Sequence, residues 1–134
     1  MALIVAYVAT LIAFAGVDSV WLGFMAQRLY RPALGDLLAA KASLPPAIAF
    51  YLLFPLGLTI FVVMPAAKSQ SLGDAALYGA LFSFFAYMTY DLTNQATLRA
   101  WPLHLSLIDM AWGFTLGGLA ASIGWLAAHR LASA

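Results

Sequence analysis

The chain has 134 residues, of which 65% are hydrophobic and only 8% charged, and its formal net charge is +1. A soluble domain is nearer half apolar and a quarter charged, so this composition predicts a protein surrounded by lipid. The six basic residues are scattered, which excludes a nucleic-acid partner, and the absence of cysteine excludes disulfides, zinc–thiolate sites and thiol catalysis.

Four apolar runs predict four transmembrane helices. A helix needs about 20 residues to cross a bilayer, and the sequence offers such runs at about residues 2–26, 47–67, 75–98 and 103–129. Strands are excluded because lipid cannot satisfy an open sheet edge. The first run lacks a basic start and is longer than the apolar core of a signal peptide, so we interpret it as a span. We expect an all-α, four-transmembrane-helix bundle forming one integral membrane domain over residues 1–134.

The longest connection, residues 27–44, predicts a short amphipathic helix at the membrane interface after the first span. From Pro32 onward, leucines recur at helical spacing. An ordinary polar loop is the alternative. Tyr30 and Trp101, at the ends of spans, are expected to be interfacial anchors.

Orientation is weakly encoded in the basic residues. The first and third connections carry Arg28, Arg31, Lys41 and Arg99, and the opposite side carries Lys68 and Arg130. The excess of four over two favours both termini outside the cytoplasm.

Three aspartates interrupt the apolar runs at matching depth. Asp91 lies nine residues before Ala100 and Asp109 nine residues after it, so a helical hairpin turning there places the two carboxyls side by side. Asp18 lies nine residues before Gln27, where the first span ends. The first and third connections share one side of a four-span bundle, so all three acids are expected in one layer.

The neighbours of these acids define a candidate site. Asp18 and Asp109 are each followed by a tryptophan in the pattern D-x-x-W, which places acid and indole on one helix face. In the third span, small and polar residues recur at spacing four and lead to Asp91, and in the fourth span G-x-x-x-G permits close helix contact. The candidate ligand-binding residues are Asp18, Trp21, Tyr87, Asp91, Asn94, Asp109 and Trp112, with Asp18, Asp91 and Asp109 as possible metal ligands.

Each feature also has a structural interpretation. The acids can simply bond neighbouring helices, the tryptophans can be packing residues, and Pro55 can simply kink the second span. His104 and His129 lie near opposite membrane faces, too far apart to bind one metal ion together.

The stretch YDLTNQATLRAWPL, followed by DMAWG, resembles a family of bacterial integral membrane proteins known as domain of unknown function 2177. The resembling segments are Tyr90–Leu98, Trp101–Pro102, Asp109–Gly113, Asp18–Leu22 and Leu29–Arg31. Gln95 departs from the more apolar residue of the pattern. The resemblance covers nearly the whole chain and implies a four-helix protein of the bacterial inner membrane, but no activity.

Three functions fit these residues. The one we favour is binding or transport of a cation at the acid and tryptophan site, where the cation is a proton, a metal ion or an organic cation. Such a narrow bundle is expected to form a homodimer. The alternatives are an accessory subunit of a larger membrane complex and an intramembrane enzyme acting on a lipid or isoprenoid. The enzyme is disfavoured because the site lacks a Lys/Arg pair for a phosphate, and a nucleophile beyond Ser19 and Thr93.

Overall fold

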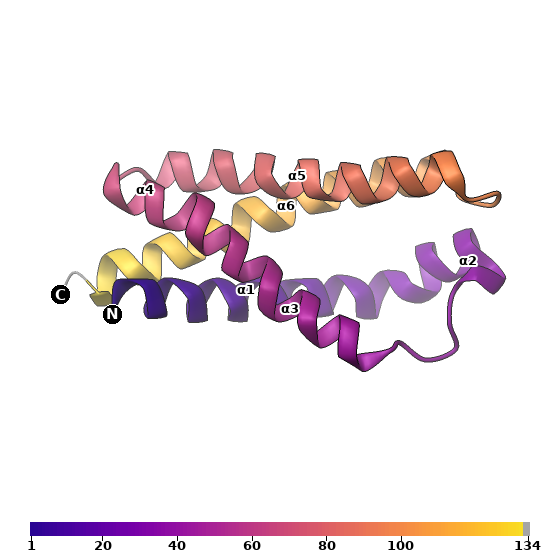
Figure 1. Ribbon diagram of the computed structural model, residues 1–134, viewed down its shortest axis with the longest axis horizontal. Coiled ribbons are helices and arrows are strands. Elements are labelled where there is room, and N and C mark those ends of the chain that lie inside the picture. The colour runs from indigo at the N-terminus through magenta and orange to yellow at the C-terminus, as the bar shows by residue number, and fades with distance from the viewer. Residues whose placement is uncertain (133–134) are drawn as a thin grey trace.

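The computed structural model describes residues 1–132, and all regular secondary structure in that part of the chain is helical. The helical elements form four rods. Figure 1 shows the start of α1 and the end of α6 at one end of the bundle, and α2 and the turn between α5 and α6 at the other. The predicted all-α class is therefore confirmed.

Three of the four rods combine regular α-helix with short π-helical or 3-10 turns, and the third is a single α-helix. The first contains α1 (Ala2–Met25), a π-helical turn (Ala26–Tyr30), α2 (Arg31–Leu34) and a 3-10 turn (Gly35–Leu37). The second contains α3 (Leu44–Leu58), a π-helical turn (Thr59–Val63) and α4 (Met64–Lys68). The third is α5 (Leu72–Thr97), and the fourth is α6 (Leu103–Ala127) with a π-helical turn (Ala128–Ala132).

Two helices begin earlier than the sequence indicated, for identifiable reasons. The second rod begins at Leu44, ahead of the predicted start at residue 47, because Pro45 and Pro46 fit the first turn of a helix, where N–H groups have no helical partner. The α5 helix begins at Leu72, ahead of residue 75, because the Ser71 side chain accepts the Asp74 N–H at 3.0 Å and caps the helix.

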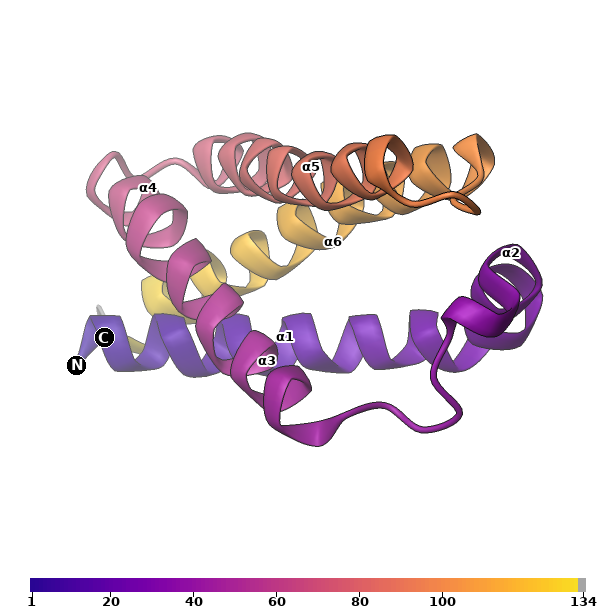
Figure 2. The same ribbon diagram turned by 45° about the vertical axis from the view of Figure 1, so that its right-hand side comes forward.

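The helix expected from Pro32 is a continuation of the first rod. It comprises the four residues of α2 and ends at Gly35, whose φ of 53° favours glycine and turns the chain away from the helix axis. An irregular segment then leads back to α3 (Figure 2). This segment is too short to form the separate amphipathic helix that the leucine spacing predicted.

Pro55 lies inside the second rod, as expected, and a widened turn follows it. The Thr59 hydroxyl donates to the Pro55 carbonyl at 2.7 Å, and the π-helical turn begins at Thr59. Prolines at positions 55 and 65 remove two backbone donors from this rod, and a wider turn is one way to re-pair the remaining groups. In Figure 1, α3 and α4 nevertheless continue as one diagonal rod.

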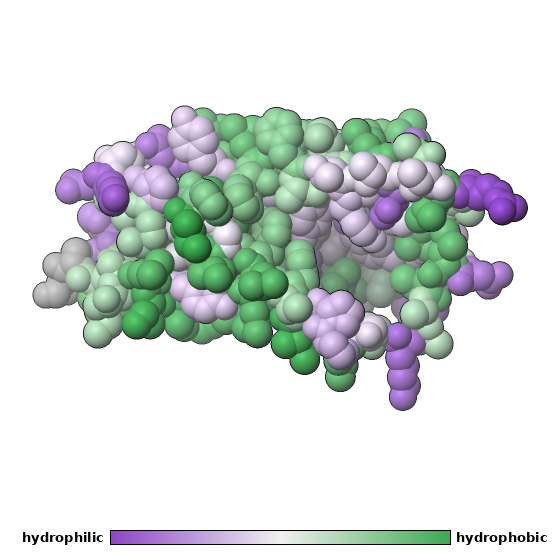
Figure 3. Space-filling model, viewed as in Figure 1, coloured by the Kyte–Doolittle hydropathy of each residue, from purple (hydrophilic) through white to green (hydrophobic). Residues whose placement is uncertain are grey.

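Three helical stretches are long and apolar enough to cross a membrane: Ala2–Leu37, Leu44–Lys68 and Leu103–Ala132. The α5 helix has 26 residues but is less apolar than the other three. On the face shown in Figure 3, hydrophobic residues predominate along the middle of the bundle, and the most hydrophilic residues gather toward its two ends. These features are those of a helical membrane protein.

Small residues bring α5 and α6 into close contact. A Cβ atom at Gly79 would lie 2.6 Å from the Ala121 Cβ, and one at Gly113 would lie 2.8 Å from the Tyr87 Cβ. Gly117 packs directly on Ser83 and on the backbone of Gly79. The G-x-x-x-G spacing therefore marks a real helix contact, which holds the two helices together along their length.

Candidate functional site

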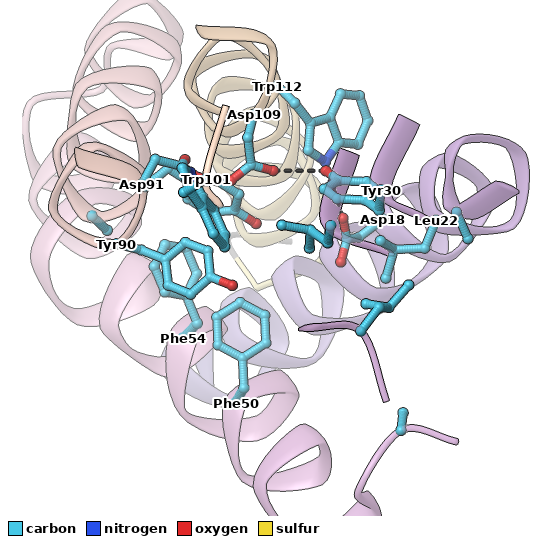
Figure 4. A pocket seen from close by; sticks show the side chains of 16 residues that line it. Asp18, Leu22, Tyr30, Phe50, Phe54, Tyr90, Asp91, Trp101, Asp109 and Trp112 are labelled. Carbon is cyan, nitrogen blue, oxygen red and sulfur yellow. Dashed lines mark hydrogen bonds between the residues drawn. The ribbon is translucent and has the colours of Figure 1, made fainter. Parts of the chain in front are cut away.

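A cavity of about 640 Å³ lies in the half of the bundle away from the termini. Figure 3 shows the hollow on the surface, and Figure 4 shows the side chains around it. All four rods contribute to its walls. The lining residues are Asp18, Leu22, Ala26, Tyr30, Leu34, Leu38, Ala42, Phe50, Phe54, Ala86, Tyr87, Tyr90, Asp91, Trp101, Asp109 and Trp112.

Asp18, on α1, is bonded from two other rods. Its side chain is 5% exposed. One carboxyl oxygen accepts the Trp112 Nε1–H at 3.0 Å, and the other accepts the hydroxyl of Tyr51. The carboxyl therefore joins α6 and α3 to α1 and has no oxygen left without a donor.

Asp109, on α6, is held by a two-step chain of hydrogen bonds. The Tyr30 hydroxyl donates to its carboxyl at 2.7 Å, which is the bond drawn in Figure 4. The same hydroxyl accepts the Trp21 Nε1–H at 2.9 Å. Since a hydroxyl that receives a hydrogen bond becomes a better donor, this arrangement strengthens the bond to Asp109.

The two D-x-x-W motifs exchange partners. Trp112, from the motif of Asp109, donates to Asp18. Trp21, from the motif of Asp18, donates to the Tyr30 hydroxyl, which in turn donates to Asp109. The cause is the antiparallel packing of α1 and α6, which places the acid of one motif level with the indole of the other. The indole rings of Trp21 and Trp112 stack on each other, with ring centres 4.3 Å apart and planes 6° from parallel.

Asp91, on α5, differs from the other two acids. It is 0% exposed, and neither carboxyl oxygen has a hydrogen-bond donor in the described structure. Its side chain lies within hydrogen-bonding reach of the Asp109 carboxyl. Two ionised carboxylates can only accept, so this contact becomes a hydrogen bond only when one of the two carries a proton.

The backbone next to Asp91 is also fixed. The Ser106 hydroxyl donates to the Asp91 carbonyl at 3.3 Å and accepts the Trp101 Nε1–H at 3.0 Å. Trp101, which the sequence analysis expected to be an interfacial anchor, therefore forms part of the cavity wall.

Five of the seven candidate residues line the cavity: Asp18, Tyr87, Asp91, Asp109 and Trp112. Trp21 lies behind the wall, in contact with Trp112 and Tyr30. Asn94 is not among the lining residues; it lies beyond Asp91 on α5, beside Tyr90.

No group of three or more His, Cys, Asp or Glu side chains within residues 1–132 has the geometry to hold a metal ion. Asp18 is bonded to Trp112 and Tyr51, whereas Asp91 faces Asp109. The expected metal site of Asp18, Asp91 and Asp109 thus has no matching geometry in this part of the chain.

Two tyrosines that donate hydrogen bonds to the acids were missed as site residues. Tyr30 was expected to be an interfacial anchor, but the π-helical turn Ala26–Tyr30 redirects the end of the first rod and brings its hydroxyl to Asp109. Tyr51 was not among the candidate residues, because its contact with Asp18 depends on the crossing of α3 over α1. A tyrosine in an apolar span was the available signal, since a buried hydroxyl needs a partner.

The cavity contains acids but no compensating base. No lysine, arginine or histidine is among its lining residues. Arg28, the first basic residue after Asp18 in the chain, donates to the Phe24 carbonyl at 2.8 Å and lies over the Phe24 ring, 4.2 Å from its centre. The cavity is therefore electronegative, and its body is aromatic and aliphatic.

Residues 3–126 match a family model described as "Predicted membrane protein (DUF2177)". The comparison with curated proteins gave no match, and neither did the comparison with solved structures.

Proposed function

The chain belongs to the DUF2177 family of predicted membrane proteins, a family of unknown function, and from the geometry of the cavity we propose that this protein binds an organic cation. The charge of the ligand lies near Asp18 and Asp109, and its apolar body contacts the aromatic side chains of the wall. The observation that carries this proposal is the presence of three buried carboxyls in an aromatic cavity whose lining contains no base.

The size and chemistry of the cavity support a small molecule. Its volume of about 640 Å³ falls within the range of about 300–1,000 Å³ of small-molecule sites, which are mostly apolar with a few placed polar groups. Phe50, Phe54 and Tyr87 supply apolar surface, and the acids supply the polar groups.

The charge of the cavity supports a cation. A carboxylate inside a membrane bundle is costly unless a positive charge accompanies it. Aromatic faces attract cations as well, which favours an organic cation with apolar groups around its charge. A metal ion fits less well, since no three-ligand group exists in the described part of the chain.

We propose the following setting for this activity. The α5 helix is a fourth span, because it packs along α6 and is long enough to cross. The protein lies in the bacterial inner membrane as a homo-oligomer, with its termini on the non-cytoplasmic side. Transport of the bound cation, an accessory role in a larger complex and lipid modification stay predictions, since no observation favours any of them.

Binding of tetraphenylphosphonium to the purified protein in lipid nanodiscs tests the proposal. Tetraphenylborate, an anion of the same shape, is the matched ligand control. We expect saturable binding of the cation only, weakened about tenfold or more by Asp18→Asn or Asp109→Asn, which corresponds to at least about 1.4 kcal/mol.

Asp36→Asn is the matched protein control, because Asp36 is exposed in the 3-10 turn and does not line the cavity. It should bind the cation as the native protein does. Equal binding of the two probes, or unchanged binding after both cavity substitutions, would contradict the proposed function.

A further inference from the structure

The Asp91 carboxyl is a buried polar group without a partner, and it lines the cavity. The side chain is 0% exposed, and both of its oxygens lack a donor in the described structure. A buried ionised carboxylate without donors or counter-charge is among the costliest groups in a membrane protein. Its surroundings must therefore contain something that relieves this cost.

Among the titratable groups around Asp91, one can form a hydrogen bond with its carboxyl. On α6, the Asp109 carboxyl is within hydrogen-bonding reach. Other titratable groups at the cavity are acids or phenols, namely Asp18 on α1, Tyr30 at the end of the same rod, Tyr51 on α3, and Tyr87 and Tyr90 on α5. The basic side chains nearest in sequence, Arg99 and His104, are exposed at the α5–α6 turn and do not line the cavity.

Two adjacent carboxyls in such a place cannot both be ionised without a cation. Like charges at hydrogen-bonding distance repel strongly in a low-dielectric interior, and here no base offsets that repulsion. One proton removes the repulsion and also gives the pair a donor, which pairs an otherwise unpartnered Asp91 oxygen. The empty cavity is therefore most stable with a proton between Asp91 and Asp109.

We infer that Asp91 and Asp109 share this proton in the empty cavity and release it when an organic cation binds. The inference rests on the proposed function. On binding, the O–H bond of the protonated carboxyl breaks, the proton passes to water, and the cation takes over the compensating positive charge. Binding then exchanges one cation for one proton, and the net charge within the cavity is unchanged.

This exchange makes affinity depend on pH in a defined direction. When one proton leaves for each cation bound, the dissociation constant rises as pH falls, by up to about tenfold per pH unit while the empty pair is protonated. At a pH high enough to remove the proton from the empty pair, the dependence disappears.

Calorimetry of tetraphenylphosphonium binding in nanodiscs measures the proton directly. Titrations at one pH in phosphate and in Tris, whose ionisation enthalpies differ, give the number of protons released. We expect close to one proton per cation for the native protein and for Asp36→Asn, and close to zero for Asp91→Asn, whose binding should also lose its pH dependence. Cation binding with no proton release in the native protein would overturn the inference and leave the proposed function intact.

A measurement on the empty protein separates the two proposals and does not depend on ligand. The infrared difference between native protein and Asp91→Asn should contain the C=O stretching band of a protonated carboxyl, and the native band should shift in D₂O. If tetraphenylphosphonium fails to bind at any pH, the proposed function fails, and the band then decides whether the proton is shared. Absence of the band at neutral pH would overturn the shared proton.

Discussion

The two halves of the bundle follow opposite packing rules. Near the termini, glycine and serine let the helices touch, as at Gly79, Ser83 and Gly117. In the other half, aromatic and acidic side chains surround a cavity of about 640 Å³. The contrast teaches how a short chain keeps an open, acidic cavity within an apolar fold. Close contact in one half fixes the helices, so the other half can hold groups that destabilise it.

The largest difference between the two halves is expected when one methyl group is added to a glycine in each of them. Gly117→Ala places a Cβ against Ser83 and the Gly79 carbonyl, whereas Gly23→Ala meets nothing within 4 Å. We expect Gly117→Ala to lower the free energy of unfolding by about 1–3 kcal/mol, as overpacking does, and Gly23→Ala to leave it unchanged or slightly higher. Thermal melts in one detergent measure both. Similar melting temperatures for the two variants would show that the α5–α6 contact is not tight.

A second pair of variants compares the indole donors of the two halves. Trp112 donates to the Asp18 carboxyl, and Trp125 donates to the Ala66 carbonyl, each at 3.0 Å. A hydrogen bond to a charged group contributes about 1.5–3 kcal/mol and a neutral one about 0.5–1.5 kcal/mol. Trp112→Phe should therefore destabilise the protein more than Trp125→Phe in urea or thermal unfolding. The reverse order would contradict a stronger hydrogen bond at Asp18 than at Ala66.

A double-mutant cycle sharpens the description of the cavity half. Trp21 acts on Asp109 only through the Tyr30 hydroxyl, so Trp21→Phe should cost less stability in a Tyr30→Phe background than in the native protein. We expect a coupling of about 0.5–1 kcal/mol, typical of directly bonded neighbours. Additive losses would contradict the two-step chain.

The smallest effect is expected at Asn94. It shares α5 with Asp91 but does not line the cavity. Asn94→Ala should therefore change the dissociation constant of tetraphenylphosphonium by less than about twofold, which is below about 0.4 kcal/mol. A loss comparable to that of Asp109→Asn would place Asn94 in the site, as the sequence had predicted.

Local periodicity and fixed helix geometry account for what the sequence predicted. The rise of a helix is constant, so equal spacing on both sides of Ala100 was enough to bring Asp91 and Asp109 together across the hairpin. G-x-x-x-G likewise marked the close face of α6.

The rest depends on how distant helices meet. Spacing placed Trp21 with Asp18, but only the antiparallel packing of α1 and α6 reveals that Trp112 is the indole that bonds Asp18. The position of Tyr30 depends on a π-helical turn that no residue pattern predicted. Tyr51 depends on where α3 crosses the bundle. Sequence reasoning therefore found the acids and missed two of their donors.

The exchange of partners between the two D-x-x-W motifs determines which positions should evolve together. Asp18 and Trp112 are 94 residues apart in the chain, and Tyr30 and Asp109 are 79 apart, yet each pair shares one hydrogen bond. Losing one member leaves a buried polar atom of the other without its hydrogen-bond partner. Related sequences that replace Trp112 should therefore also change Asp18, and those that replace Tyr30 should change Trp21 or Asp109. We therefore expect co-variation to follow the contacts between helices and not the contiguous D-x-x-W motifs.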